Sequence, residues 1–575
     1  MATVLREASA GHKMALDKDV QIRLSDGAVL RADVYRPEAA GKYPAIMTYG
    51  PYGKDSHISQ FMGDGWDALK KRHPEIVSRS SAKHMVFERP DPETWVPHGY
   101  AVIHVDCRGA GRSPGKLDVN SPQEFKDFKE AIEWAGVQPW CNGKVGLLGI
   151  SYYAAGQWMV ASYKPKYLAA ILPWSGTCDF YRDRTRHGGI FVNGFVGRWW
   201  QRSVLNNQNG KPDSTLTDFV NGARSTGPAS LTEDQLKANR LDYIDNVRAH
   251  PTLDPWYRER SGDLSKIEVP ALVVANWGGL GLHLRGNIMG WVGIASKDKW
   301  LKVQTGPYFA TFFAPDSNDF QRKFFDRYLK GIDNGWEKEP RVDITVRSHD
   351  DKVHRHIHDT SWPLTGTRFT KLHLDAANKA LGFEAPKASG QQTYKAQGEG
   401  VTFTTAPLAE DTEIVGPLKA KLQLSSSTPD MDIFLTVLAF DPTGKEVNFA
   451  TNFDPAPVSQ GWLRGTLRKL DKVRSSDWQP VHTFEQVQPL KPGEVTECEV
   501  EVWPTAVHLP KGSRLALIVA GSDFKGTGKP GSSSSGMFLH NDPVDRPPEK
   551  FSGDYTVHTG GGRECWLQIP VIAKR

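Results

Sequence analysis

The sequence predicts an α/β domain that carries a helical insertion and is followed by an all-β domain. Short apolar runs alternate with helical patterns over residues 1–177 and again over 265–337, which is typical of a single α/β domain. Polar and aromatic segments with helical stretches, such as Leu231–Val247, fill residues 178–264. From 338 to 575 helices largely stop, and short strands between turn clusters predict a β sandwich or jelly roll. A chain of 575 residues is too long for one hydrophobic core.

Eight apolar runs in the α/β part have the length and composition of buried strands. They are Val20–Leu24, Val29–Tyr35, Pro44–Thr48, Tyr100–Val105, Gly146–Gly149, Tyr167–Pro173, Val269–Asn276 and Trp300–Val303. A helix is expected over Pro122–Ala135, since Ser121 can cap its first turn, and an amphipathic helix over Phe320–Leu329. Because strands resume after residue 264, we expect the insertion to form a cap on one domain.

Six further runs are expected to be strands of the all-β domain. They are Val342–Val346, Leu418–Leu424, Ile433–Ala439, Val495–Val502, Arg514–Val519 and Cys565–Val571. Turn clusters such as Asp441-Pro442-Thr443-Gly444 separate them. Glycine and serine dominate Gly526–Gly536, so we expect a flexible loop there.

Charge and cysteine content narrow the class of function. The 71 basic and 66 acidic residues give a net charge of +5 without long runs, so no nucleic-acid partner is expected. The first seven residues contain no apolar leader, and no later segment has the pattern of a membrane span. The five cysteines are scattered and odd in number, which favours reduced thiols and a cytoplasmic location.

The run Lys144–Tyr153 is the most informative part of the chain. An apolar strand leads into Gly149-Ile150-Ser151, and small helix-favouring residues follow. This pattern is typical of a nucleophile elbow, in which a serine on a sharp strand-to-helix turn exposes its hydroxyl. The second glycine usual in such elbows is replaced by Tyr153. An isolated Gly-x-Ser could also be an ordinary turn after a buried strand, so the surrounding motifs decide.

Motifs along the chain support the elbow. They are Gly50-Pro51-Tyr52-Gly53-Lys54, Asp106-Cys107-Arg108-Gly109-Ala110-Gly111-Arg112-Ser113, Ile132-Glu133-Trp134, Gln138-Pro139-Trp140-Cys141-Asn142-Gly143-Lys144-Val145-Gly146, Gly149-Ile150-Ser151-Tyr152 and Phe325-Asp326-Arg327-Tyr328-Leu329-Lys330-Gly331. With these motifs nearly the whole chain resembles the cocaine esterase and X-Pro dipeptidyl-peptidase group of serine hydrolases, which also includes α-amino-acid ester hydrolases. The resemblance implies an α/β-hydrolase domain, a helical cap and a C-terminal jelly roll.

The resemblance also implies roles for three residues. Ser151 is expected to be the nucleophile of acyl transfer, activated by a base. The oxyanion hole of the group uses a tyrosine hydroxyl and the backbone N–H after the nucleophile, which correspond to Tyr52 and Tyr152. Tyr52 closely follows the strand Pro44–Thr48, where an α/β hydrolase supplies its second donor. The alternative for Tyr52 is an aromatic side chain that merely packs its loop.

The acid and the base are missing from their usual places. In the turn after Val269–Asn276, where the related hydrolases have a carboxylate, this chain has Gly279. Where the group has a histidine, after the next strand, this chain has Ala310. A shift of register would place Tyr308 there, which is no base either. We expect His283, just after the acid-bearing turn, to reach Ser151 instead, with a histidine packed at a helix start as the alternative.

Other candidates have weaker support. Asp179 could orient the base, but it could equally cap a helix of the insertion, and His187 could line the pocket or lie at the surface. The loop Asp106–Arg108 is expected to fix the sheet edge and a neighbouring helix. Three histidines alternate along a probable strand and so share one face, which we expect to face solvent rather than to bind a metal ion: His354, His356 and His358. Four aromatic residues of the insertion either pack the cap or shape an acyl pocket: Phe191, Phe195, Trp199 and Trp200.

Three functions are compatible with these residues. The first is a serine hydrolase that cleaves a small carboxylic ester, amide or peptide-like substrate through an acyl-enzyme, with a non-standard acid–base relay. The second is acyl transfer or cyclisation on the same scaffold. The third is a catalytically degenerate ligand-binding member, or an engineered variant that has lost its histidine. We expect a small-molecule partner, no cofactor, no metal, no membrane and a possible homo-oligomer.

Overall fold

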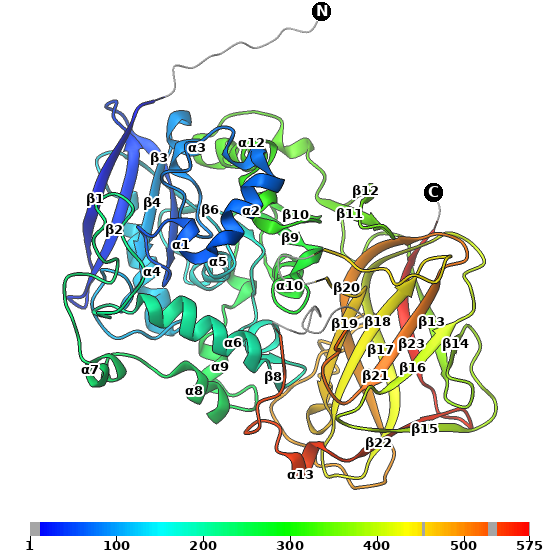
Figure 1. Ribbon diagram of the computed structural model, residues 1–575. Helices are drawn as coiled ribbons and strands as arrows, with labels where there is room; N and C mark the ends of the chain where they lie inside the picture. Colours follow the sequence, from blue (N-terminus) through cyan, green and yellow to red (C-terminus); the bar gives the residue numbers. More distant parts are fainter. Residues whose placement is uncertain (1–11, 451–454, 527–537, 574–575) are drawn as a thin grey trace, which may run out of the picture.

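The computed structural model describes residues 12–450, 455–526 and 538–573. It contains an N-terminal α/β part and a C-terminal part built almost entirely of strands, which lie side by side in Figure 1. The first seven residues, where no leader is expected, and positions 527–536 of the expected flexible loop fall outside the described residues.

A mixed β-sheet forms the centre of the α/β part. The hydrogen-bonded order of its strands is β1, β2, β4, β3, β5, β6, β9 and β10, parallel from β4 onward. The strands are β1 (Met14–Arg23), β2 (Val29–Pro37), β3 (Tyr43–Gly50), β4 (Ala101–Asp106), β5 (Cys141–Ile150), β6 (Leu168–Trp174), β9 (Ala271–Asn276) and β10 (Lys299–Gln304). All eight strands expected in this part are present.

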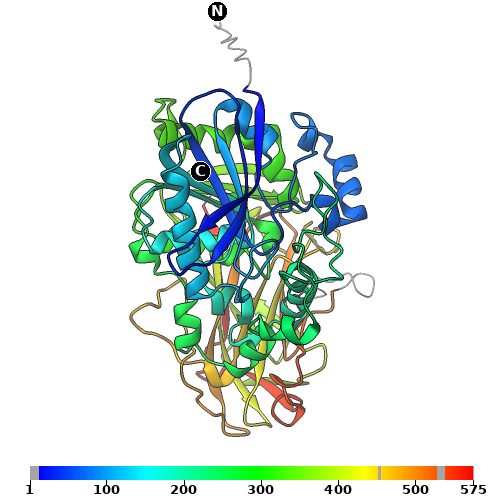
Figure 2. The same ribbon diagram turned by 90° about the vertical axis from the view of Figure 1, so that its left-hand side faces the viewer.

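Helices bury both faces of the sheet. Two apolar clusters, one on each face, hold them in place. One face is covered by α4 (Pro122–Gly136), α5 (Tyr152–Ser162) and α10 (Leu284–Gly293). The other is covered by α1 (Ile58–Met62), α2 (Asp64–Arg72), α3 (Pro92–Trp95), α11 (Tyr308–Phe313) and α12 (Pro315–Phe325). In Figure 2 the blue helices α1 and α2 lie to the right of the sheet and the cyan helix α4 to its left.

Two helices illustrate how local sequence sets their ends. Ser121 caps α4 as expected, since its side chain accepts the N–H of Glu124. The expected amphipathic helix begins earlier, at Pro315, and continues as a wider helical turn to Lys330. Gly331, with φ of +73°, ends it in the left-handed conformation that glycine adopts readily.

The insertion between β6 and β9 consists of short elements. They are β7 (Arg186–His187), β8 (Ile190–Phe191), α6 (Asn193–Trp199), α7 (Glu233–Ala238), α8 (Tyr243–Ala249) and α9 (Pro255–Glu259). The stretch Leu231–Val247, read as helical, is therefore broken in two, because Asp242 caps a new helix by accepting the N–H of Asp245. In Figure 1 the insertion lies below the central sheet and beside the C-terminal strands.

The C-terminal part is a set of mainly antiparallel strands. They are β13 (Thr367–Asp375), β14 (Ala380–Gly382), β15 (Gly390–Lys395), β16 (Val401–Thr405), β17 (Thr412–Ser426), β18 (Asp432–Phe440), β19 (Ser459–Arg464), β20 (Thr496–Leu509), β21 (Arg514–Ala520), β22 (Asp554–Thr559) and β23 (Trp566–Ile572), with one short helix, α13 (Pro548–Phe551). The long strand β17 pairs with β20, β22 and β23, and β21 pairs with β16 and β18. The strands expected within this part are present.

Strand β11 (Val342–Ser348) joins the two parts. Its first residues pair with β10 of the central sheet, and Arg347 and Ser348 pair with β20. Strand β12 (Val353–Asp359) pairs with the other edge of β11. The two sheets are thus continuous through hydrogen bonds. Within the described ranges, no helix has the length and apolar character that crossing a membrane requires.

Candidate active site

Ser151 stands on a strained turn between β5 and α5. Its φ of 59° and ψ of −110° are unusual for a residue with a side chain, as expected for a nucleophile elbow. Gly149 permits this turn, because a Cβ there would lie 2.5 Å from Cβ of Tyr153. The large Tyr153 at the position of the usual second glycine fits because Gly50 opposite it has no side chain. A Cβ on Gly50 would approach the Tyr153 ring to 2.8 Å.

His283 is the imidazole that meets this serine. Its Nε2 lies 3.0 Å from Oγ of Ser151, within hydrogen-bonding distance. The residue follows β9 and immediately precedes α10, and it is 3% exposed. Burial, together with the positive charge of Arg184, lowers the pKa of His283 to about 3. The imidazole is therefore neutral at pH 7 and able to accept a proton.

Gly279 and Ala310 lie beside this pair. A Cβ on Gly279 would be 3.2 Å from Cβ of His283, so the site of the missing carboxylate adjoins the histidine that contacts Ser151. Ala310 is buried in α11, and Tyr308 of the same helix packs edge-on against the His283 ring at 5.8 Å. Among the described residues, no carboxylate forms a hydrogen bond or ion pair with His283.

A small aromatic cavity surrounds the Ser151 hydroxyl. Its volume is about 160 Å³, and both Ser151 and His283 line it. Aromatic rings form most of the remaining wall: Tyr52, Phe61, Phe87, Phe195, Trp199 and Tyr308. Two rings of the insertion, Phe195 and Trp199, therefore contribute to this pocket, whereas Trp200 stacks on Tyr243 within the insertion.

Tyr52 is held in the wall by a residue of the insertion. Its hydroxyl accepts a hydrogen bond from Nε1 of Trp199 at 2.6 Å. Because the indole can only donate, the tyrosine proton stays available for another acceptor in the cavity. Burial raises the pKa of Tyr52 well above its usual range, so the hydroxyl keeps this proton at physiological pH.

The side chain of Tyr152 points away from the cavity. Its hydroxyl donates to the carboxylate of Glu124 on α4, at 2.7 Å to the nearer oxygen. This bond fixes the first turn of α5, where the backbone N–H of Tyr152 lies. That N–H faces the carboxyl group of Glu88.

Glu88 is a site residue that the sequence did not reveal. It is 3% exposed and lines the cavity together with Ser151, and the Ser151 hydroxyl and the Tyr152 N–H both act to lower the pKa of its carboxyl group. Burial raises the pKa of Glu88 well above its usual range. In the sequence Phe87-Glu88-Arg89-Pro90 no motif marks it, and only the folded loop between α2 and α3 brings it to Ser151.

Arg184 supplies a positive charge next to the site. Its guanidinium lies 4.5 Å from the ring centre of Trp199 and 4.9 Å from that of Tyr152, and it donates to Asn120 Oδ1 at 3.0 Å. Within the described ranges it forms no ion pair with a carboxylate. Its charge adds to the effect of burial in lowering the pKa of His283, whereas at Glu88 it offsets only part of the rise in pKa that burial causes. The sequence gives no signal for it, because arginine is common in helical segments.

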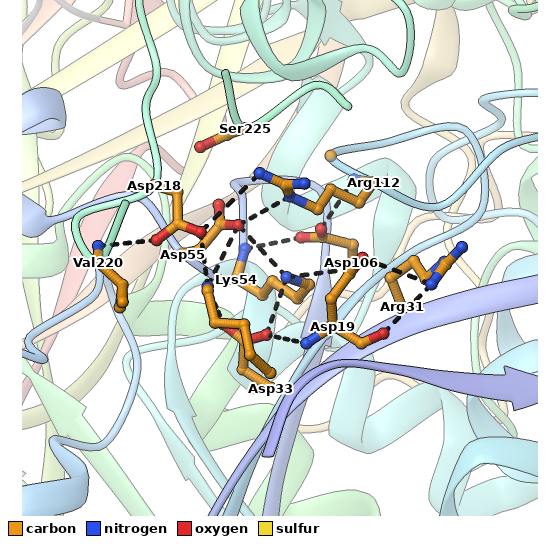
Figure 3. Close-up of polar contacts among 12 residues, drawn as sticks. Asp19, Arg31, Asp33, Lys54, Asp55, Asp106, Arg112, Asp218, Val220 and Ser225 are labelled. Carbon is orange, nitrogen blue, oxygen red and sulfur yellow. Dashed lines mark hydrogen bonds and ion pairs between the residues drawn. The ribbon is translucent and has the colours of Figure 1, made fainter. Parts of the chain in front are cut away.

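A buried ion cluster supports the loop that carries Tyr52 (Figure 3). Nζ of Lys54, two residues further on, lies 2.9 Å from Asp33 and 3.3 Å from Asp55. The Lys54 backbone N–H donates to Asp106 at 2.7 Å. Asp33, Asp55 and Lys54 have fully buried side chains. The cluster ties the β1–β2 hairpin, the Tyr52 loop and the end of β4 together.

Asp179 and His187 do not reach Ser151. Asp179 caps a helical turn by accepting the N–H groups of Tyr181 and Arg182, which agrees with the capping alternative. His187 is buried, not at the surface, and its Nδ1 lies 2.9 Å from His540 in the C-terminal part. Neither residue lines the aromatic cavity.

The remaining candidates are structural. Arg108 pairs with Asp127 of α4 at 2.7 Å and so fixes the helix to the sheet edge, as expected for its loop. The histidine row on β12 is exposed to solvent, and its members contact carboxylates of neighbouring strands: His354, His356 and His358. In the described part of the chain, no group of three His, Cys, Asp or Glu side chains could hold a metal ion.

Comparisons with known proteins agree with the two-part fold. The family model of X-Pro dipeptidyl-peptidase (S15 family) matches residues 26–307, and that of the X-Pro dipeptidyl-peptidase C-terminal non-catalytic domain matches 334–568. A crystal structure of a CocE/NonD family hydrolase from Staphylococcus aureus superposes with a TM-score of 0.84. It is 31% identical, and the match covers 97% of this chain and 94% of that one.

Curated relatives are more distant in sequence but match over most of their length. Cocaine esterase of Rhodococcus is 24% identical, with 97% of this chain and 98% of that protein covered. A putative Xaa-Pro dipeptidyl-peptidase of Streptomyces avermitilis is 24% identical over 85% of this chain and 76% of its own length. The resemblance seen in the sequence motifs is thus confirmed, and the chain is an enzyme of the hydrolase family that contains cocaine esterase and the X-Pro dipeptidyl-peptidases.

Proposed function

We propose that this protein is a serine hydrolase that cleaves a small carboxylic ester, amide or peptide-like substrate through an acyl-enzyme. The observation that carries the proposal is the 3.0 Å contact between Ser151 Oγ on the elbow and the neutral imidazole of His283. A neutral imidazole at this distance can take the serine proton as the hydroxyl attacks a carbonyl carbon. Relatives named as serine esterases and dipeptidyl-peptidases support the substrate class.

The proposed reaction proceeds in two halves. Ser151 attacks the carbonyl carbon while His283 accepts its proton, and the tetrahedral oxyanion receives hydrogen bonds from the Tyr52 hydroxyl and the Tyr152 N–H. The tetrahedral intermediate collapses as the imidazolium returns the proton to the leaving oxygen or nitrogen. Water then attacks the acyl-enzyme, with His283 again accepting a proton and giving it to Ser151. Since no described carboxylate contacts His283, the imidazolium is compensated mainly by the oxyanion.

The surroundings support a small substrate. A cavity of about 160 Å³ accommodates an acyl group of about the size of a benzene ring, and the aromatic rings in its wall favour an apolar group. Arg198 and Arg202, which also line the cavity, add positive charge to its wall. In this proposal the insertion is a helical cap that supplies Phe195 and Trp199, and the C-terminal strands form a jelly roll beside it. The five cysteines are free thiols, which supports a reducing compartment such as the cytoplasm.

A fluorophosphonate probe tests the nucleophile. We expect stoichiometric labelling of the full-length protein, and none in Ser151→Ala. His283→Gln should retain the fold and lose about 10²–10⁴-fold in kcat for a p-nitrophenyl ester, the usual contribution of a general base. Absence of labelling in the folded wild-type protein would refute the proposal, and it would favour a ligand-binding member. Product analysis with a competing amine separates hydrolysis from acyl transfer, since only the latter gives an amide product.

A further inference from the structure

The carboxyl group of Glu88 lies where the proposed reaction develops negative charge. Glu88 lines the same cavity as Ser151, Tyr52 and His283, and its backbone carbonyl accepts the N–H of Ile150, the residue before Ser151, at 3.0 Å. The Ser151 hydroxyl and the Tyr152 N–H, one of the two expected oxyanion donors, both act to lower the pKa of its carboxyl group, which agrees with this position. Its charge also acts on Tyr52, the other expected donor. A tetrahedral oxygen bound by Tyr52 and Tyr152 would therefore lie next to Glu88.

The surroundings of Glu88 favour the protonated carboxylic acid. The side chain is 3% exposed, and none of the described Lys, Arg or His side chains forms an ion pair with it. Its Oε2 is fully buried and has no hydrogen-bond partner within the described ranges. An ionised carboxylate in such a place would be strongly destabilised, whereas the neutral acid has a proton to donate. The raised pKa of Glu88 agrees with this state.

We propose that Glu88 is a third donor of the oxyanion site: its protonated carboxyl group donates a hydrogen bond to the negative oxygen that forms when Ser151 attacks a carbonyl group. This inference rests on the proposed function, because it assigns a role at the same reaction centre. The ionised form would repel that oxygen and accept the Tyr152 N–H itself. Glu88 thus supports the reaction only while it carries its proton.

The backbone around Glu88 is held rigidly, as a preorganised donor requires. Glu88 has a φ of 62°, which is unfavourable for a residue with a side chain, and its carbonyl oxygen accepts the Ile150 N–H at 3.0 Å. The next residue, Arg89, is fully buried and donates to the Tyr153 hydroxyl at 2.9 Å and to Thr48 at 3.2 Å. Glu88 is therefore fastened to the strand and helix on either side of Ser151.

Other charged and titratable groups face Glu88 but do not change charge between pH 5 and 10. His283 is neutral because its pKa is about 3. Burial raises the pKa of the facing tyrosines, so they stay protonated: Tyr52, Tyr153 and Tyr308. The other charged groups near Glu88 are the guanidinium groups of Arg184 and of two residues in the cavity wall, Arg198 and Arg202. A guanidinium group does not lose its proton in this pH range. A loss of activity at alkaline pH that originates at this centre would therefore report on Glu88.

Two substitutions at Glu88 test the inference in the full-length protein, with p-nitrophenyl acetate as substrate and the Ser151→Ala rate subtracted. Glu88→Gln retains a donor of the same shape, so kcat at pH 6 should stay within about 5-fold of wild type. Glu88→Leu retains the bulk but has no donor, so kcat should fall about 10²-fold with little change in KM. Any alkaline loss of wild-type activity should be absent from Glu88→Gln, which does not titrate.

The controls distinguish this role from others. Glu124→Gln removes a second buried carboxyl group, which contacts Tyr152 from outside the cavity, and it should leave an alkaline limb in place. If kcat of Glu88→Gln falls as far as that of Glu88→Leu, Glu88 acts as a carboxylate base, and its assignment as a hydrogen-bond donor is wrong. If Glu88→Leu keeps the wild-type kcat, or if the limb persists in Glu88→Gln, the inference is wrong. Failure of Ser151-dependent turnover in the wild-type protein would instead refute the proposed function itself.

Discussion

Nε1 of Trp199 donates a hydrogen bond of 2.6 Å to the hydroxyl of Tyr52. Trp199 belongs to the insertion and Tyr52 to the loop after β3, so this contact joins the cap to the proposed oxyanion site. Because the indole N–H has no acceptor capacity, it fixes the tyrosine oxygen while leaving the hydroxyl proton free to point into the cavity. In the proposed mechanism the insertion would therefore position an oxyanion donor as well as line the pocket.

Removing the Tyr52 hydroxyl should lower kcat with little effect on KM. We expect Tyr52→Phe to lose about 10²-fold in kcat, since one oxyanion donor typically contributes about 3 kcal/mol to the transition state. Trp199→Phe keeps an aromatic wall but loses the bond to Tyr52, and it should lose about 10-fold. The double variant should be no slower than Tyr52→Phe, because Trp199 acts through Tyr52. Steady-state kinetics on a p-nitrophenyl ester check this, and additive losses would contradict it.

The pH dependence of activity should show an unusually acidic limb. If His283 is the proposed base, activity requires its neutral form, and its pKa of about 3 means that protonation sets in only near that pH. As the pH falls from 7 to 4, kcat/KM should therefore stay level where the protein remains folded. A histidine with an ordinary pKa would instead become protonated near pH 6.5, and activity would fall there. Initial rates at closely spaced pH values provide the measurement. A limb near pH 6.5 would show that His283 is not the base.

Arg184 should help to set this limb. Its positive charge disfavours the imidazolium, so its removal in Arg184→Gln should raise the pKa of His283 and move the acidic limb to higher pH. Arg184→Lys keeps the charge and serves as the matched control, in which the limb should stay closer to the wild-type position. If the acidic limb lies at the same pH in Arg184→Gln and in the wild-type protein, burial alone lowers the pKa of His283.

The same histidine should make the fold sensitive to acid. In the unfolded chain a histidine binds a proton near pH 6.5, whereas folded His283 does so only near 3, so the unfolded state binds more protons between these values. Stability should therefore decrease as pH falls from 6.5 toward 3, by up to about 1.4 kcal/mol per pH unit from this residue. Urea unfolding at pH 7 and pH 4.5 should show a smaller decrease for His283→Gln. An identical decrease in both proteins would refute this contribution.

How far the sequence predicts this site depends on where each residue lies along the chain. Ser151 and Tyr52 follow strands within recognisable motifs, so their places at the carboxyl edge of the sheet could be predicted. The place of His283 at this edge could be predicted in the same way, because the residue closely follows β9, which pairs with β6 in the sheet. Glu88 and Arg184 could not be predicted as site residues, since each comes from an irregular segment whose position depends on tertiary packing.

The same distinction applies to the fold. Buried strands such as β9 can be recognised by a continuous run of apolar residues, Ala271–Ala275. Strand β13 (Thr367–Asp375) consists mostly of polar and charged residues, and the sequence does not predict it. In the insertion, hydrophobic periodicity indicated helix over Leu231–Val247 but not the break before Asp242, which depends on a side-chain cap. Pairing between β11 and β20 could not be read from the sequence either, because it joins strands more than 150 residues apart.

Lys54 should matter for stability and, through Tyr52, for activity. Its ammonium group is the buried cation between Asp33 and Asp55, as Figure 3 shows, so Lys54→Met leaves two carboxylates in the interior with less compensation. Removing one partner from a buried ionic group typically costs about 3–5 kcal/mol when the other charge is left unpaired. Because Lys18 still pairs with Asp33 at 2.7 Å and Arg112 with Asp55 at 3.2 Å, we expect a loss at or below the lower end of this range in urea unfolding. The exposed pair of Lys352 with Asp350 provides the control, since Lys352→Met should leave the unfolding midpoint unchanged.

Activity separates the two consequences of this change. Lys54 lies two residues after Tyr52 and anchors the loop through its backbone bond to Asp106, which methionine retains. If the ionic cluster positions Tyr52, folded Lys54→Met at low temperature should lose kcat with nearly constant KM, and a second change, Tyr52→Phe, should then cost less than it does in the wild-type protein. A destabilised variant with full kcat would show instead that the cluster stabilises the sheet edge alone. The backbone bond between Lys54 and Asp106 would then suffice to hold the donor in place.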